Sequence, residues 1–325
     1  TAYLPGPLPG ELVLAHPSIK RGDGWAATAE LLATSDERAP PPCPHFSLCG
    51  GCALQHWDDA AYLAWKTGLL ATALQRAGYS DAPAAAIRTP PAARRRIDLA
   101  ILRKGPVFLL GLHGKRSAEI VDLQACPVLH PTLFALIAPL RTLLRGLTGL
   151  RRSGSAILNL LDSGPDLLLR LDAPLSTPDR TKLAAFAAAH GIPRISAAVN
   201  DGPHEPAAQQ RPPTTTMSGI TVTPPPGVFL QASAEGEAAI IAAIIAGLPP
   251  LKGRARIAEL YAGCGTLTFA LAQHARVAAF EGDAEAHAAL RQAVNSQGLA
   301  GRIEAHRRDL TRQPHSGRWL SLLRL

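Results

Sequence analysis

The pattern of apolar and polar positions divides the chain into regions of different character. Residues 11–16 and 24–35 alternate over short runs and are separated by a charged turn, which predicts two strands. From Asp58 onward, apolar side chains recur every three to four positions, and Gly78 follows the last of them. Because aspartate is a good helix N-cap and glycine commonly follows a helix end, we predict a helix between these two residues.

The middle of the chain contains both the alternating pattern of strands and the three-to-four-residue spacing of helices. Residues 94–123 predict an antiparallel meander of three strands, with turns at RKGP and HGKRS. Residues 131–200 predict a helix, two strands and a second helix. Residues 201–218 are polar and rich in proline without periodicity, which predicts a loop or a domain linker.

The last region has a regular alternation. GVFLQAS (227–233) predicts a short strand before a helix, and residues 254–310 predict strand, glycine-rich turn, helix, strand, helix and a third strand. Such βαβα alternation is typical of a parallel, doubly wound sheet. The sequence therefore predicts an α/β fold whose last part is Rossmann-like.

Charge adds a candidate partner. The 325 residues include 33 Lys and Arg against 25 Asp and Glu, a net charge of +8. A generic basic surface is one explanation, but the cations cluster, which favours a polyanion such as nucleic acid. The clustered cations that we expect to hold phosphates are Arg94, Arg95, Arg96, Lys115 and Arg116. With neither a signal peptide nor an apolar run of ~20 residues, we expect a monomeric cytoplasmic protein without a membrane span.

Three of the five cysteines lie within ten positions, as Cys43, Cys49 and Cys52. Grouped thiolates suit zinc or an iron–sulfur centre, and the two glycines before Cys52 allow a tight turn. Cys126, which follows the meander, is the natural fourth ligand. Zinc sites of four cysteines usually pair two C-x2-C knuckles, and this chain has one, which favours a [4Fe–4S] cluster and leaves structural zinc as the alternative.

A G-x-G turn, Gly263 and Gly265, stands between an apolar strand and a helix. Glu281 ends the next strand, near the ~20-residue distance at which an acid accepts hydrogen bonds from ribose hydroxyls. The absence of a third glycine favours S-adenosylmethionine over a dinucleotide. Asp309, after the third strand, is either a contact to adenine or a surface acid, and Cys264 is interpreted as a small packing residue.

These motifs together resemble the RNA 5-methyluridine (uracil-C5) methyltransferase family, particularly its iron–sulfur members that modify 23S rRNA. CPHFSLCGGCALQH (43–56) resembles the family's cluster motif, GVFLQAS its segment with a donor-contacting glutamine, and ELYAGCGTLTF (259–269) its donor-binding motif. The resemblance implies that donor contacts come from Gln231, Tyr261, Thr266, Glu281 and Asp309. A relative that modifies tRNA is an alternative.

The resemblance also implies an organisation and a chemistry. It assigns residues 1–40 to a partial OB-like TRAM region, 41–200 to an iron–sulfur and RNA-binding domain, 201–218 to a linker, and 219–325 to a class I methyltransferase domain. In the family's reaction a cysteine thiolate adds to C6 of uracil, and C5 then takes the methyl group.

The chain departs from the family at its C-terminal end. No segment resembles the family's DPPR or SCNP motifs, so no catalytic residue is assigned and we expect a chain cut short after its third parallel strand. Such a chain would have an exposed apolar sheet edge and no turnover. The alternatives are a non-catalytic RNA-binding iron–sulfur protein and a zinc-stabilised RNA-binding module.

Overall fold

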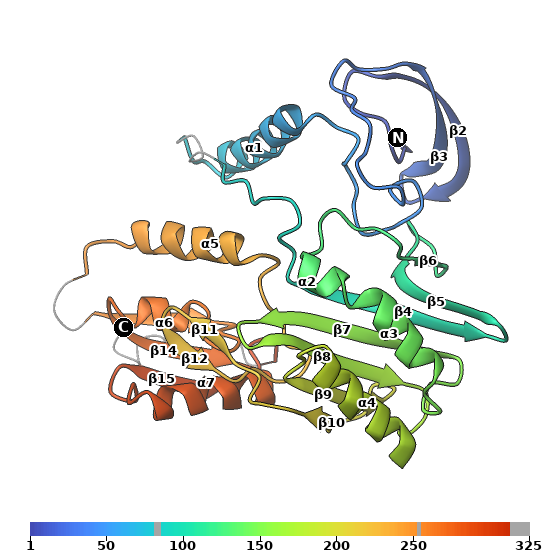
Figure 1. The fold of residues 1–325 in the computed structure, drawn as a ribbon. Helices are drawn as coiled ribbons and strands as arrows, with labels where there is room; N and C mark the ends of the chain where they lie inside the picture. The colour runs from blue at the N-terminus through green and yellow to red at the C-terminus, as the bar shows by residue number, and fades with distance from the viewer. Residues whose placement is uncertain (81–85, 252–254, 313–325) are drawn as a thin grey trace. The chain divides into compact units, whose positions relative to one another are not determined.

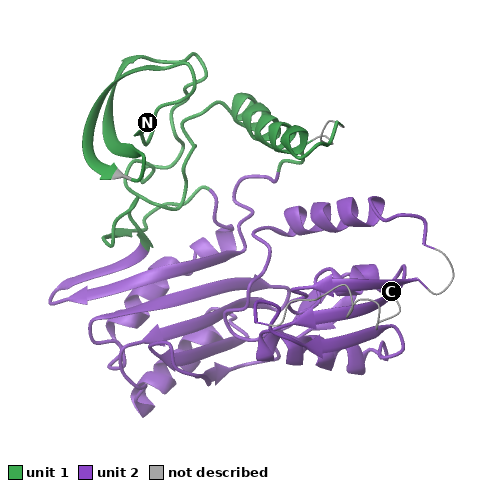
Figure 2. Ribbon diagram, turned by 180° about the vertical axis from the view of Figure 1, so that it is seen from behind, with its two compact units in different colours: residues 1–88, 112–127 green, residues 89–111, 128–325 purple. Residues whose placement is uncertain are grey.

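The computed structural model describes residues 1–80, 86–251 and 255–312 (Figure 1). The chain forms two compact units, residues 1–88 with 112–127 and residues 89–111 with 128–325 (Figure 2). Each unit is described by itself. The two units are defined by contacts within the folded chain. They do not test the domain boundaries inferred from the sequence, which stay predictions.

The first unit contains a small sheet and one long helix. β2 (Leu12–Arg21) and β3 (Gly24–Ala33) pair antiparallel, and β1 (Ala2–Tyr3) pairs parallel with β3. α1 (Asp59–Arg76) begins after Asp58, whose carboxylate accepts the N–H groups of the two alanines at positions 60 and 61. The predicted strands and helix are therefore confirmed.

The larger sheet of the second unit has the strand order β10-β9-β8-β7-β4-β5. Its neighbours pair antiparallel except β8 and β9, which are parallel and joined by a helix, α4 (Thr177–Ala189). β6 (Ile120–Asp122) and the last two residues of β5 belong to the first unit. The strand bounds are β4 Arg96–Lys104, β5 Val107–His113, β7 Ser153–Leu161, β8 Gly164–Leu171, β9 Arg194–Val199 and β10 His204–Gln209.

Helices α2 (Pro131–Phe134), α3 (Ile137–Arg145) and α4 (Thr177–Ala189) accompany this sheet (Figure 1). The core is built mostly from leucine, as the low aromatic content requires. Its fully buried members include Leu99, Leu110, Leu140, Leu144, Leu158 and Leu167. The predicted meander, strands and helices of residues 94–190 are present, and β9 is a strand that the sequence pattern did not reveal.

The segment predicted as a loop or a domain linker, residues 201–218, contains strands, so the prediction of a loop is wrong and its place as a linker stays a prediction. β10 pairs with β9, and β11 (Thr215–Met217) pairs antiparallel with β12 (Ile220–Val222). The register of β10 is irregular between Pro206 and Ala208. Because β10 is an edge strand, the missing N–H of Pro206 costs no ladder bond on the outer side, and a proline-rich sequence can still pair.

The second prediction that fails concerns residues 227–233, which follow three consecutive prolines and form no strand. Hydrogen bonds from two side chains hold this segment, and strand pairing does not. Asn159 Nδ2 donates to the Val228 carbonyl at 2.9 Å, and Arg95 Nε donates to the Gln231 carbonyl at 3.1 Å. The segment leads directly into α5 (Ala234–Ala246).

A three-stranded parallel sheet, in the order β13-β14-β15, completes the second unit. Its strands are β13 (Arg256–Leu260), β14 (Arg276–Glu281) and β15 (Ile303–Arg307), with α6 (Thr268–Leu271) and α7 (Ala284–Ser296) between them. This confirms the predicted parallel alternation. The carboxyl ends of all three strands meet at one edge, where ligands bind in open α/β sheets.

Candidate functional site

The glycine-rich turn lies at this carboxyl edge and is fixed by the next strand. The Gly263 N–H donates to Glu281 Oε2 at 2.7 Å, which joins the turn after β13 to the end of β14. Gly263 has φ +58° and Gly265 φ +107°. A Cβ on Gly265 would lie 2.4 Å from a ring carbon of Phe269, so this position requires glycine.

The Glu281 carboxylate is held at both oxygens. Its Oε1 accepts the Asp283 N–H at 2.7 Å, while Oε2 accepts from Gly263. Each carboxylate oxygen has a second lone pair, which remains available to a ligand hydroxyl. Tyr261, at φ +60° and 69% exposed, stands on the same edge. The structure therefore brings the turn and the acid together at the carboxyl edge of the sheet, and their role in binding a ribose stays a prediction.

The other predicted donor contacts are less closely joined to this pair. The Thr266 hydroxyl lies 3.8 Å from Met217 Sδ, and the exposed Asp309 accepts the N–H groups of Thr311 and Arg312. Gln231 is half-buried and is anchored through its carbonyl. Among the described residues, no hydrogen bond links the side chains of Gln231, Thr266 or Asp309 to Glu281, so their roles stay predictions.

A buried carboxyl beside the turn was missed by the sequence reasoning. Glu259, in β13, is 8% exposed and accepts a hydrogen bond from the Thr268 hydroxyl at 2.6 Å. Burial raises the pKa of Glu259 to about 7, and the nearby charge of Glu281 adds to this rise. The available signal was an acid inside an otherwise apolar strand just before a glycine-rich turn.

Cys264, inside the turn, is 5% exposed. Burial, together with the charges of Glu281 and Asp283, raises the pKa of its thiol to about 12. At neutral pH the group is therefore a protonated thiol, and a thiol is a poor nucleophile. The interpretation of Cys264 as a packing residue agrees with this environment.

The four remaining cysteines belong to the first unit. Burial raises the pKa of Cys52, and the charges of Cys126, Cys49 and Cys43 add to the rise, so all four sulfurs lie within electrostatic range. The Gly51 N–H donates to Cys49 Sγ at 3.4 Å. In the part of the chain that the structure describes, however, no three His, Cys, Asp or Glu side chains converge as ligands of one metal ion.

The five predicted phosphate-binding cations have different surroundings. Arg95 Nη2 pairs with Glu237 at 2.6 Å, with both side chains 12% exposed, and Arg96 lies over the Phe229 ring at 4.9 Å. Both therefore brace the segment before α5. Arg94, Lys115 and Arg116 are exposed. The exposed three keep the charge that a phosphate would need, whereas Arg95 already has a carboxylate partner.

Comparison with known proteins places these features in a class. The structure matches that of the Pyrococcus abyssi tRNA (uracil-54, C5)-methyltransferase in complex with S-adenosyl-L-homocysteine, with a TM-score of 0.65 over 93% of this chain and 74% of that one, at 18% identity. The likeness shows that the two chains share a mixed α/β fold. No family model matches the chain. No helix within the described ranges could cross a membrane.

Two proteins found by sequence comparison have a higher identity to this chain than the solved structure has. The chain is 36% identical over 314 residues to an uncharacterized RNA methyltransferase of Brucella suis, covering 96% of this chain and 72% of that protein. It is 34% identical over 280 residues to the 23S rRNA (uracil(1939)-C(5))-methyltransferase of Pectobacterium atrosepticum, covering 85% of this chain and 62% of that protein. The chain belongs to the RNA methyltransferases.

Proposed function

We propose that this chain belongs to an enzyme that transfers a methyl group from S-adenosylmethionine to C5 of uracil in RNA, with 23S rRNA as the substrate. The observation that carries the proposal is the Gly263–Glu281 hydrogen bond at the sheet edge, in a chain similar to RNA methyltransferases over 96% of its length. The relative from Pectobacterium atrosepticum, named for uracil C5 in 23S rRNA, favours this base and this RNA.

The donor site follows from the chain's own residues. Glu281 would accept the ribose hydroxyls, and the glycines of the turn would let the backbone approach the ligand closely. Tyr261, exposed at the same edge, would cover one side of the ligand, and Gln231, Thr266 and Asp309 are the further proposed contacts. The sulfonium of the bound donor would supply the methyl group.

The nucleophile required by addition at C6 of uracil is not assigned to any cysteine of this sequence. Cys264 stays protonated, and the other four cysteines form the group in the first unit. We therefore expect this chain to supply donor binding and RNA binding, and we assign none of its five cysteines to attack on uracil.

For the grouped cysteines we propose a structural [4Fe–4S] cluster held by Cys43, Cys49, Cys52 and Cys126. Each thiolate of such a cluster binds a different iron atom, so the four sulfurs need not converge on one point as they would around zinc. The N–H of Gly51 directed at Cys49 Sγ suits a negatively charged sulfur. A Cβ on Gly50 would lie 2.9 Å from the His113 carbonyl, so the close turn requires glycine there.

Cys126→Ser is the first test of this centre. After anaerobic purification we expect the unchanged chain to contain about four irons and to absorb near ~400 nm, and the variant to lose most of both. Cys264→Ser is the matched control, since that residue lies in the other unit, and it should keep its iron. The cluster would be contradicted if all three proteins contained equal amounts of iron, or if they contained zinc in place of iron.

Glu281→Ala tests the donor site. Removal of the carboxylate leaves ribose hydroxyls without their acceptor, so we expect the Kd for S-adenosylhomocysteine, measured by calorimetric titration, to rise roughly 10–100-fold. Glu304→Ala, on the exposed surface of β15, should leave the Kd unchanged. If the two variants bind alike, Glu281 is not the ribose acceptor.

A further inference from the structure

A cavity of about 1150 Å³ lies within the first unit. Its walls come from the N-terminal loop before β2, from β3, from the cysteine segment (residues 43–56), and from residues 112–116. All of these segments belong to the same compact unit. Pockets of about 300–1,000 Å³ hold drug-sized ligands, so this cavity has room for one or two nucleotides.

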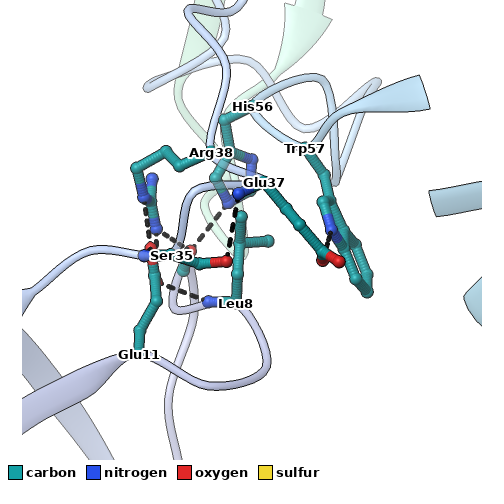
Figure 3. Close-up of polar contacts among 8 residues, drawn as sticks. Leu8, Glu11, Ser35, Glu37, Arg38, His56 and Trp57 are labelled. Atoms are coloured by element: carbon teal, nitrogen blue, oxygen red, sulfur yellow. Dashed lines mark hydrogen bonds and ion pairs between the residues drawn. The ribbon is translucent and has the colours of Figure 1, made fainter. Parts of the chain in front are cut away.

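Polar contacts fix the wall on the side of the N-terminal loop (Figure 3). The Arg38 guanidinium donates to both oxygens of Glu11, at 2.6 Å each, and holds the pKa of Glu11 down at about 2. His56 Nε2 lies 2.7 Å from the Gly6 carbonyl, which also accepts from Arg38 at 3.1 Å. The loop is thus tied to the cysteine segment, and the cavity has a built wall.

Apart from Cys52, which belongs to the proposed cluster, the charged side chains of the lining are the cations Arg38, Lys115 and Arg116. The lining includes no aspartate or glutamate. The charge of Arg38 is balanced by Glu11, but Lys115 and Arg116 are exposed and have no carboxylate within ion-pair distance in the described part of the chain. Two uncompensated cations therefore face a space from which acidic side chains are excluded, which favours an anionic ligand.

An aromatic ring stands beside these cations. Lys115 Nζ lies 4.0 Å from the centroid of the Phe46 ring, and Leu31 and Leu54 add apolar surface to the lining. Phe46 is half-buried, and its ring packs against that of His56 with the centroids 5.1 Å apart. Aromatic rings interleaved with cations bind single strands, because each base can stack on a ring while its phosphate is neutralised. A free phosphate would use the cations but not the apolar wall, and the paired bases of a duplex could not reach the ring.

We propose that this cavity binds one or two unpaired nucleotides of the RNA substrate, with a base stacked on Phe46 and its phosphate held by Lys115 and Arg116. The inference rests on the proposed function for the presence of RNA, and it adds a site away from the donor. Because the ammonium group of Lys115 covers the ring, we expect it to move to the phosphate when the base enters.

The test is binding of a fluorescent single-stranded 12-nucleotide RNA to the full chain, followed by anisotropy at several salt concentrations. We expect Lys115→Ala/Arg116→Ala to weaken binding roughly tenfold and to flatten the salt slope by about 0.7, the value for one single-strand phosphate. Phe46→Leu, which keeps the packing volume, should weaken binding roughly tenfold with the slope unchanged. RNA carrying 5-iodouridine should crosslink to the peptide that contains Phe46.

The matched control is Lys66→Ala/Arg76→Ala, which removes two cations of α1 in the same unit outside the cavity lining. It should bind within about twofold of the unchanged chain. The cavity proposal is overturned if the chain binds RNA but both cavity variants equal this control, or if duplex RNA or inorganic phosphate displaces the probe as well as the single strand does. Failure of the unchanged chain to bind any RNA would instead overturn the proposed function.

Discussion

Asp166→Ala is expected to lower the free energy of unfolding of the second unit by about 3–5 kcal/mol. Asp166 and Arg194 form a bidentate ion pair between β8 and β9, with both N–O distances 2.8 Å. The two residues are 1% and 8% exposed, and Arg194 also donates to the Pro224 carbonyl at 2.9 Å. Loss of the carboxylate leaves a guanidinium buried without its counter-charge.

Urea unfolding followed by circular dichroism measures this cost. Glu205→Ala is the matched control, since Glu205 pairs with Arg180 on the surface of the same unit, with side chains 59% and 37% exposed. Exposed pairs contribute about 0–1 kcal/mol, so this variant should unfold close to the unchanged chain. An Asp166 variant no less stable than the control would show that the buried pair is not needed for the fold.

The second large effect concerns Glu259 and pH. Its pKa rises on folding from an ordinary value of 4.5 to about 7, so the folded state binds more protons than the unfolded state in this range. The stabilisation is complete below pH 4.5 and is lost as pH rises through about 7. At about 1.4 kcal/mol per pH unit, the loss attributable to this group reaches roughly 3 kcal/mol.

Glu259→Gln should remove that loss. The glutamine carbonyl can still accept the Thr268 hydroxyl but carries no charge at any pH. We expect the variant to match the unchanged chain at about pH 4 and to be more stable at about pH 8 by roughly 3 kcal/mol in urea unfolding. Glu304→Gln, an exposed control on β15, should follow the unchanged chain throughout. A Glu259 variant that shows the same pH profile as this control would mean that the buried carboxyl does not titrate there.

The sequence was most informative where a local rule and the final fold agree. Asp58 predicted the start of α1 because N-capping depends only on adjacent backbone groups. The parallel alternation after residue 254 predicted the edge of the sheet where Gly263 meets Glu281. These features need no knowledge of distant contacts.

The remaining features depend on partners far away in the sequence. Residues 227–233 have a strand-like composition, but the bonds that hold them come from Asn159 and Arg95. Arg95 was predicted to bind phosphate because its sequence neighbours are also arginines. Its actual partner, Glu237, lies 142 positions away and cannot be identified from the local sequence. Proline content concealed β10, since the strand's edge position, which makes Pro206 tolerable, is a property of the assembled sheet.

Methylated nucleosides of 23S rRNA provide the most direct test of uracil C5 as the acceptor. The protein for this test is a fusion of this chain with the part of the Brucella suis relative that lies outside the match. Unmodified RNA would be incubated with this fusion and labelled S-adenosylmethionine, and then digested for mass spectrometry. Binding of S-adenosylhomocysteine would first establish that the fusion has folded. We predict 5-methyluridine as the labelled nucleoside. Label on another base, or no label from a fusion that binds both donor and RNA, would contradict the assignment.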